Sequence, residues 1–165
     1  MIRFEYLRKS DFSVLSQQIF DILADNMTVI APTGNTRKED FGMWHDAVGD
    51  GLQREERQII LIKDKETLVG YFQYSINKDT FMMEEIQLKS AFQGKGVSRE
   101  LYGFVLKDIK NDLQFVEAFA SINNNKSIGI LEKFGLSNTG LNKNGRSYHF
   151  KGNFSDLIKW YEGEK

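Results

Sequence analysis

The stretch TFMMEEIQLKSAFQGKGVS, residues 80–98, decides how this chain folds. Residues 80–89 have the length and composition of a strand, and Gly94-Lys95-Gly96 follows shortly after. Beyond the glycines, apolar residues recur at the spacing of a helix face: Val97, Leu101, Val105 and Ile109. The stretch therefore predicts a strand, a glycine turn and a helix.

A helix that begins after two glycines is a candidate anion site. The first backbone N–H groups of a helix lack partners within it, and the helix dipole is positive at that end. Glycines let the backbone approach a phosphate closely, so residues 93–98 suit a pyrophosphate. For a lone Gly-x-Gly, an ordinary glycine-rich turn is the favoured interpretation. Neither a Walker loop nor the G-x-G-x-x-G of a Rossmann nucleotide site is present.

The N-terminal half carries signals for strands and two helices. Strands are expected at residues 2–8, 57–63, 68–76 and 80–89, and turns at 64–66 and 77–79 make the last three an antiparallel meander. Ser10 or Asp11 can cap a helix whose apolar face holds Phe12, Leu15, Ile19, Ile22 and Leu23.

A loop and a second helix follow the first one. Residues 28–35, with the only proline, are expected to form the loop. Thr36 and Glu39 have the spacing of a capping box, so a second helix should begin there, and Gly49 and Gly51 are expected to end it.

The C-terminal half predicts a parallel crossover followed by a hairpin. A strand at residues 115–122 comes after the helix, and a strand–helix–strand order favours parallel pairing. Asn124 can cap a helix that Gly135 ends. Two short strands around the turn 142–145 and a helix over 154–161 complete the chain. The sequence thus predicts a single α+β domain over residues 1–165, with a mixed central sheet and flanking helices.

Composition narrows the class of function. Charged residues make up 27% of the 165 residues, the formal net charge is -1, and no basic cluster is present, so no nucleic-acid partner is expected. There is no cysteine, and the two histidines are far apart in sequence, so no metal is expected. The N-terminus has no apolar signal core and no apolar run is long enough for a membrane span. These features predict a cytoplasmic protein without a membrane partner.

Two segments together resemble the GNAT family of acetyl-CoA-dependent N-acetyltransferases. Residues 83–98 resemble its acetyl-CoA segment, Gln/Arg-x-x-Gly-x-Gly/Ala after the fourth strand. Residues 124–136, NNKSIGILEKFGL, resemble its second signature, Asn-x-x-Ala-x-x-Leu-Tyr-Glu-Lys-x-Gly-Phe. The two occur in the family's order and span about a third of the chain. The resemblance implies the GNAT fold, acetyl-CoA as cosubstrate and direct transfer of the acyl group to an amine.

The resemblance also implies a set of cofactor-binding residues. The pantetheine arm would lie in a gap between the strands at 80–89 and 115–122. It would bond to the backbone near Ile86 and Leu88, with Asn124 and Ser127 beside it. The pyrophosphate would rest on the backbone of Gln93, Gly94, Lys95, Gly96, Val97 and Ser98.

The chain departs from the family pattern at three positions. Ser98 replaces the usual Gly or Ala and Ser90 replaces a common proline, and both changes are expected to be tolerated. The family's tyrosine, often assigned as the acid for the leaving thiolate, falls at Leu131, which cannot donate a proton. Tyr102 and Tyr148 are substitutes for which a structural role is the competing interpretation.

Glu84 and Glu85 are the candidate catalytic bases. Side chains alternate faces along a strand, and Glu84 shares its face with Met82, Ile86 and Leu88. Desolvation there would raise the pKa of Glu84 and make it a better base near neutral pH. Glu85 lies on the more polar face, where it is solvated or attracts a cationic acceptor. A bulge in this strand would reverse the assignment.

The acceptor is a small-molecule or peptide amine whose identity the sequence does not specify. Its recognition is expected from the segment between Met27 and Trp44 and from the late hairpin. Candidates there are Asp40, Phe41, Trp44, His45, Asp46, Tyr148 and His149, each of which core packing or solvation also explains. A homodimer is compatible with the family. Two other functions stay open: a noncatalytic acyl-CoA-binding module of the same fold, and a different α+β domain that binds a nucleotide.

Overall fold

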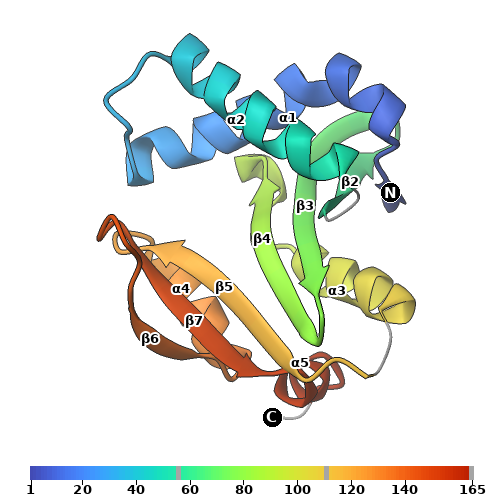
Figure 1. Cartoon of the computed structure of the whole chain (residues 1–165). Helices are drawn as coiled ribbons and strands as arrows, with labels where there is room; N and C mark the ends of the chain where they lie inside the picture. The colour runs from blue at the N-terminus through green and yellow to red at the C-terminus, as the bar shows by residue number, and fades with distance from the viewer. Residues whose placement is uncertain (55–56, 110–111, 164–165) are drawn as a thin grey trace. The chain divides into compact units, whose positions relative to one another are not determined.

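The computed structural model describes residues 1–54, 57–109 and 112–163 (Figure 1). Its strands form a seven-stranded sheet in the order β1-β2-β3-β4-β5-β7-β6. Together with the helices, this mixed sheet confirms the predicted α+β class. The chain divides into two compact units, Met1–Tyr74 with Glu85–Val97 and Ser75–Glu84 with Ser98–Lys165, and each is described by itself.

The first unit combines two helices with the N-terminal strands. Its elements are β1 (Ile2–Tyr6), α1 (Phe12–Ile30), α2 (Arg37–Gln53), β2 (Arg57–Asp64) and most of β3 (Thr67–Asn77). β1 pairs with β2 in antiparallel register, Phe4 opposite Ile62. Every side chain from Leu68 to Tyr74 is buried. Because neighbouring side chains of a strand point to opposite faces, β3 is covered on both faces.

Apolar side chains of α1 and α2 pack against β2 and β3. The core there is formed by Ile19 and Ile22 of α1, Val48 and Leu52 of α2, Ile59 and Leu61 of β2, and Leu68 and Tyr71 of β3. Burying such side chains supplies most of the stability of a small domain. The apolar stripe predicted for α1 is therefore confirmed at the positions that face the sheet.

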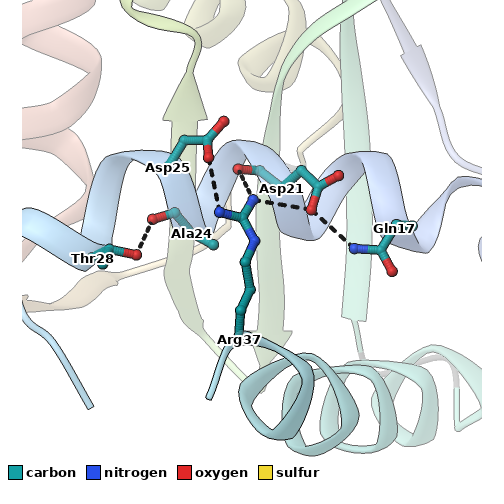
Figure 2. Close-up of polar contacts among 6 residues, drawn as sticks. All are labelled: Gln17, Asp21, Ala24, Asp25, Thr28 and Arg37. Atoms are coloured by element: carbon teal, nitrogen blue, oxygen red, sulfur yellow. Dashed lines mark hydrogen bonds and ion pairs between the residues drawn. The ribbon is translucent and has the colours of Figure 1, made fainter. Parts of the chain in front are cut away.

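Arg37, at the start of α2, ties the two helices together on their exposed side (Figure 2). Its Nη1 donates to Asp25 Oδ1 at 3.0 Å, and its Nη2 donates to Asp21 Oδ1 at 3.1 Å. Gln17 Nε2 donates to the same Asp21 oxygen at 2.9 Å. The two carboxylates raise the pKa of Arg37 above its ordinary value. Because the pairs are solvent-exposed, they orient α2 more than they stabilise the fold.

The capping box at the start of α2 is confirmed, but two predicted helix ends are wrong. Thr36 Oγ1 accepts from the Glu39 N–H at 3.1 Å, and Glu39 Oε1 accepts from the Thr36 N–H at 2.9 Å. α1 continues through Thr28 to Ile30, so the predicted loop begins later. Thr28 Oγ1 donates to the Ala24 carbonyl, one turn earlier (Figure 2).

α2 continues through the glycines that were expected to end it. A Cβ on Gly49 would lie 3.3 Å from the Phe12 ring, and one on Gly51 would lie 2.7 Å from the Arg57 guanidinium. These glycines therefore serve close packing against α1 and β2, and the helix ends only at Gln53.

The second unit contains the parallel crossover and the C-terminal hairpin. Its elements are the first part of β4 (Thr80–Leu88), all but the first residue of α3 (Val97–Asp108), β5 (Phe115–Ser121), α4 (Asn125–Lys133), β6 (Ser137–Leu141), β7 (Ser147–Asn153) and α5 (Phe154–Tyr161). β4 and β5 pair in parallel from Thr80–Phe115 to Met83–Ala118, as predicted. β7 pairs antiparallel with both β5 and β6. Within the described part of the chain, no helix is both long enough and apolar enough to cross a bilayer.

Gly70 marks a close approach between β3 and the end of β4. A Cβ there would lie 2.5 Å from the Gln87 carbonyl oxygen and 2.7 Å from Leu88 Cδ2. We expect Gly70→Ala to lower the free energy of unfolding by about 1–3 kcal/mol, because a strand backbone cannot yield easily. Urea denaturation measures the change.

Gly42→Ala is the matched control for Gly70→Ala. Gly42 is exposed on α2, and a Cβ there meets nothing within 4 Å. This variant should gain about 0.5–1 kcal/mol, because alanine is the better helix former. Stabilisation of similar size in both variants would contradict the close approach at Gly70.

Candidate functional site

The loop between β4 and α3 holds two glycines in the left-handed region. Gly94 has φ +73° and Gly96 has φ +80°, and a Cβ built on either meets nothing within 4 Å. Both are exposed, so the loop presents bare backbone to solvent. α3 begins at Val97 and is 12 residues long, so its first N–H groups carry the positive end of a full helix dipole. This backbone fits a phosphate group.

The carbonyl oxygen of Leu88 holds the beginning of this loop. Gln93 Nε2 donates to it at 2.9 Å, and Asn26 Nδ2 of α1 donates to it at 2.8 Å. Gln93 was predicted to bind the cofactor through its backbone, and its side chain is bound to the end of β4. This side chain therefore fixes the glycine loop to the strand.

Asn26 has a structural role that was not predicted from the sequence. A signal for it exists: Asn26 continues the apolar stripe of Ile19, Ile22 and Leu23 by one helical turn. A polar side chain on the covered face of a helix needs a hydrogen-bond partner. Here the partners lie on β4, about sixty residues further along the chain, at the end of β4 that precedes the glycine loop.

A line of hydrogen bonds continues from Asn26 to Glu85. Asn26 Nδ2 donates to Gln87 Oε1 at 2.9 Å, and Gln87 Nε2 donates to Glu85 Oε2 at 2.7 Å. Gln87 is buried and Glu85 is half-buried. Burial raises the pKa of Tyr71 well above its ordinary value, and the charge of Glu85 adds to the rise. Glu85 is therefore an ordered member of a polar network rather than a freely solvated residue.

Glu84, the other candidate base, accepts a hydrogen bond from Ser75 Oγ at 3.2 Å. Like Met82, it is half-buried, whereas Phe81 and Met83 are buried. The expectation that the face of Met82 is the buried one is therefore wrong for this part of β4.

Packing against helices explains which face of β4 is buried. The Phe81 ring lies 6.1 Å from that of Phe154 in α5, and Tyr102 of α3 donates from its hydroxyl to Met83 Sδ at 3.6 Å. The odd-numbered side chains thus face helices of the second unit, and Met82 and Glu84 face the other way.

The start of α4 is formed as the sequence predicts. Asn124 Oδ1 accepts from the Ser127 N–H at 3.2 Å, which makes Asn124 the cap of the helix. The two residues predicted to flank a pantetheine arm are thus brought together, and both are half-buried. Gly135, with φ +89°, follows the end of the helix as expected.

Leu131 and Tyr102, one of the two tyrosines considered for the acid role, are both buried. Leu131, on α4, is 8% exposed. Tyr102 packs between the rings of Phe134 and Trp160, at 5.3 Å and 5.6 Å. Burial raises the pKa of Tyr102 well above its ordinary value, so its phenol is a poor proton donor. The structural interpretation of Tyr102 is favoured.

The aromatic candidates for acceptor recognition on α2 are part of the packing against α1. Trp44 lies 5.8 Å from Phe12 and 5.5 Å from Phe20, and His45 stacks on Phe12 at 5.2 Å. Phe41 meets Phe20 edge-on at 5.4 Å.

The remaining acceptor candidates have polar partners or lie on β7. Asp40 accepts from Thr33 Oγ1 at 2.6 Å, and Asp46 Oδ1 is 3.5 Å from His45 Nδ1. On β7, Tyr148 is half-buried, and His149 Nε2 lies 2.7 Å from Glu117 Oε1. No sequence signal indicates this pair, because the two residues are far apart along the chain.

The predicted site residues are distributed over both units. Glu85, Ile86, Leu88 and residues 93–97 belong to the first unit, and Glu84, Ser98, Asn124 and Ser127 belong to the second. Among the described residues, no three His, Asp or Glu side chains are grouped to hold a metal ion.

The model of the acetyltransferase (GNAT) family matches residues 16–136, which is more than half of the chain. This chain belongs to the GNAT acetyltransferase family. The match contains both motifs on which the resemblance rested, so that resemblance is confirmed. No curated protein matches this GNAT sequence significantly.

Solved structures similar to this GNAT chain share its fold at low sequence identity. The PaiA N-acetyltransferase from Thermoplasma acidophilum in complex with coenzyme A is 13% identical over 93% of this chain and 99% of its own, with a TM-score of 0.71. An acetyltransferase from Thermus thermophilus is 13% identical over 93% and 97%, also with a TM-score of 0.71. Spermidine N-acetyltransferase from Vibrio cholerae in complex with CoA and spermine is 17% identical over 95% and 98%, with a TM-score of 0.64.

Truncating Leu131 tests whether this position serves packing. We expect Leu131→Ala to lower the free energy of unfolding by about 2–5 kcal/mol, because the side chain is buried. Ile130→Ala, at the neighbouring position that is 41% exposed, should cost much less. Chemical denaturation of both variants measures the difference, and equal losses would argue against a packing role specific to Leu131.

Proposed function

We propose that this GNAT protein is an N-acetyltransferase that moves an acetyl group directly from acetyl-CoA to an amine. One observation carries the proposal: the open glycine backbone at the start of α3 lies inside the segment that the family model matches. Two similar structures contain CoA, which supports the same cosubstrate for this chain. We propose that the reaction takes place in the cytoplasm, and a homodimer is compatible with it.

The residues proposed to bind acetyl-CoA come from the end of β4, the glycine loop with the start of α3, and the start of α4. The parallel ladder between β4 and β5 ends at Met83 and Ala118, whereas β4 runs on to Leu88. Ile86 and Leu88 thus lie beyond the ladder, where we propose that their backbone binds the pantetheine arm. Asn124 and Ser127 flank the arm. The pyrophosphate lies on the backbone of Gln93, Gly94, Lys95, Gly96, Val97 and Ser98.

Glu84 is proposed to remove the proton from the acceptor amine. A primary ammonium is mostly protonated at neutral pH, so a base must act before the nitrogen can attack a thioester. Glu84 lies half-buried on β4 and is oriented by Ser75. Glu85, held by Gln87, adds a negative charge that attracts a cationic acceptor. Because Leu131 cannot donate a proton and Tyr102 is buried, solvent or Tyr148 protonates the leaving thiolate.

The acceptor belongs to the small-molecule or peptide amines. Spermine is bound by one structural neighbour, so polyamines belong in the first panel of acceptors, with amino acids, an aminoglycoside and peptide N-termini. Release of CoA from acetyl-CoA is the measurement. Turnover with any of these amines supports the enzyme, whereas tight CoA binding without turnover favours a noncatalytic acyl-CoA-binding module, which the apolar Leu131 also fits. Stronger protection by ATP than by CoA in a thermal-shift assay would favour the nucleotide-binding alternative.

Gly96→Glu tests the placement of the pyrophosphate. The new side chain would put bulk and negative charge on the backbone that should hold the phosphates, so CoA affinity should fall strongly by calorimetry. Gly34→Glu is the matched control, because Gly34 has φ +83°, close to the +80° of Gly96, and equally open surroundings. The control should share any cost of backbone strain but bind CoA normally. Undiminished CoA affinity in Gly96→Glu would rule out this placement.

Glu84→Gln tests the base. The substitution keeps the shape and the Ser75 contact but removes basicity, so turnover should fall by about 10²–10⁴-fold while acetyl-CoA affinity is preserved. Glu85→Gln should mainly raise the KM for the acceptor. Steady-state kinetics with a working acceptor separates the two. A dead Glu85→Gln beside an active Glu84→Gln would transfer the role to Glu85, and two active variants would direct attention to His45 or His149.

A further inference from the structure

Three neighbouring strands of the second unit bring a carboxylate, an imidazole and a hydroxyl into one line. Glu117 Oε1 on β5 lies 2.7 Å from His149 Nε2 on β7. The other nitrogen of the same ring, Nδ1, lies 2.5 Å from Thr139 Oγ1 on β6. All three residues belong to one unit, so their arrangement does not depend on the other.

The pairing of the strands explains why these side chains meet. Phe119 is opposite His149 and Glu117 is opposite Lys151, so Glu117 and His149 are diagonal neighbours on one face of the sheet. Between β6 and β7 the register shifts, with Asn138 opposite Phe150 and Gly140 opposite His149.

Thr139 is the extra residue at this register shift. A β-bulge redirects side chains, and Gly140, with φ +126°, allows the backbone to bend there. The bulge turns the Thr139 hydroxyl toward the His149 ring.

The chemistry of the partners fixes the position of the protons. An ionised carboxylate only accepts hydrogen bonds, so the nitrogen facing Glu117, Nε2, carries the hydrogen. In a neutral imidazole the other nitrogen then has a free lone pair, and Nδ1 accepts from the Thr139 hydroxyl. The hydroxyl has a second, longer acceptor in the His149 carbonyl oxygen at 3.2 Å. Both acceptors lie within reach of the hydroxyl proton, and Nδ1 is the basic one of the two.

The surroundings favour reactivity of the hydroxyl. The side chains of His149 and Glu117 are only 24% and 23% exposed, which strengthens their interaction, whereas Thr139 is open to solvent. The ring of Phe119 lies 5.0 Å from that of His149, and this residue is itself 50% exposed. Phe119 thus offers an apolar surface beside the imidazole that receives the proton.

We propose that Thr139 is a nucleophilic hydroxyl that accepts an acyl group from an activated ester. Thr139 Oγ1 attacks the carbonyl carbon of the ester while its proton passes to His149 Nδ1. The bond from the carbonyl carbon to the leaving oxygen or sulfur breaks, and that atom takes the proton, directly or through solvent. The products are an ester of Thr139 and a free alcohol or thiol. Glu117 is a positioning residue, which holds the tautomer and orientation of His149.

The test uses 4-nitrophenyl acetate with the full chain, so it does not depend on CoA binding or on an amine acceptor. Release of nitrophenolate is followed by absorbance, and the acetylated residue is located by peptide mass spectrometry. We expect one acetyl group on Thr139, formed faster than acetylation of the surface lysines in the same sample. His149→Gln and Glu117→Gln should each lower the labelling rate of Thr139, the former by about 10²–10⁴-fold, with the lysines as internal reference.

Variants at Thr139 separate chemistry from folding. Thr139→Val keeps the shape and should abolish labelling at this position, whereas Thr139→Ser should retain it. Ser137→Ala, on the same strand, should behave as the unaltered chain does. Labelling of Thr139 at the rate of an ordinary hydroxyl, an unchanged rate in His149→Gln, or an acetyl group mapped to another residue would overturn the proposal. If thermal melting shows that Thr139→Val is unfolded, the His149→Gln variant decides. The rate of Thr139 labelling relative to lysine labelling is then compared between this variant and the unaltered chain.

Discussion

The carbonyl oxygen of Leu88 is the point on which the end of β4 and the glycine loop depend. A carbonyl has two lone pairs, and here the Asn26 and Gln93 amides bind both. Each bond contributes only about 0.5–1.5 kcal/mol, but together they connect α1, the last residue of β4 and the loop at one atom. Asn26 also donates to the buried Gln87, which in turn holds Glu85. A change at Asn26 thus alters both the glycine loop and the orientation of Glu85, a candidate site residue.

Elements with a local cause could be predicted from the sequence. The capping box at Thr36 and the Asn124 cap each depend on residues within one helical turn, and the apolar stripe of α3 depends on residues that recur once per turn. The end of α2 could not be predicted, because Gly49 and Gly51 are there for neighbours on other elements, Phe12 and Arg57. The local rule for glycine was sound, but tertiary packing overrode it.

The buried face of β4 also could not be predicted from alternation. The apolar residues Met82 and Ile86 suggested that their face of β4 is the buried one, yet the helices of the second unit cover Phe81 and Met83 instead. In a sheet covered on both faces, as β3 shows, the alternation of apolar and polar residues loses its meaning. On such strands, the hydrogen-bond partners of a side chain indicate its role better than its position in the alternation does.

Groups that meet only through strand pairing could not be predicted from the sequence. The catalytic candidates came from motifs on one segment, whereas Thr139, His149 and Glu117 meet only because β5, β7 and β6 are neighbours in the sheet. The one-residue shift between β6 and β7 decides whether Thr139 meets His149. In a regular ladder, Thr139 would be paired directly with a residue of β7, and its side chain would alternate with those of its neighbours. A hydroxyl beside a carboxylate-bound imidazole is therefore a product of strand register, and no spacing along the chain encodes it.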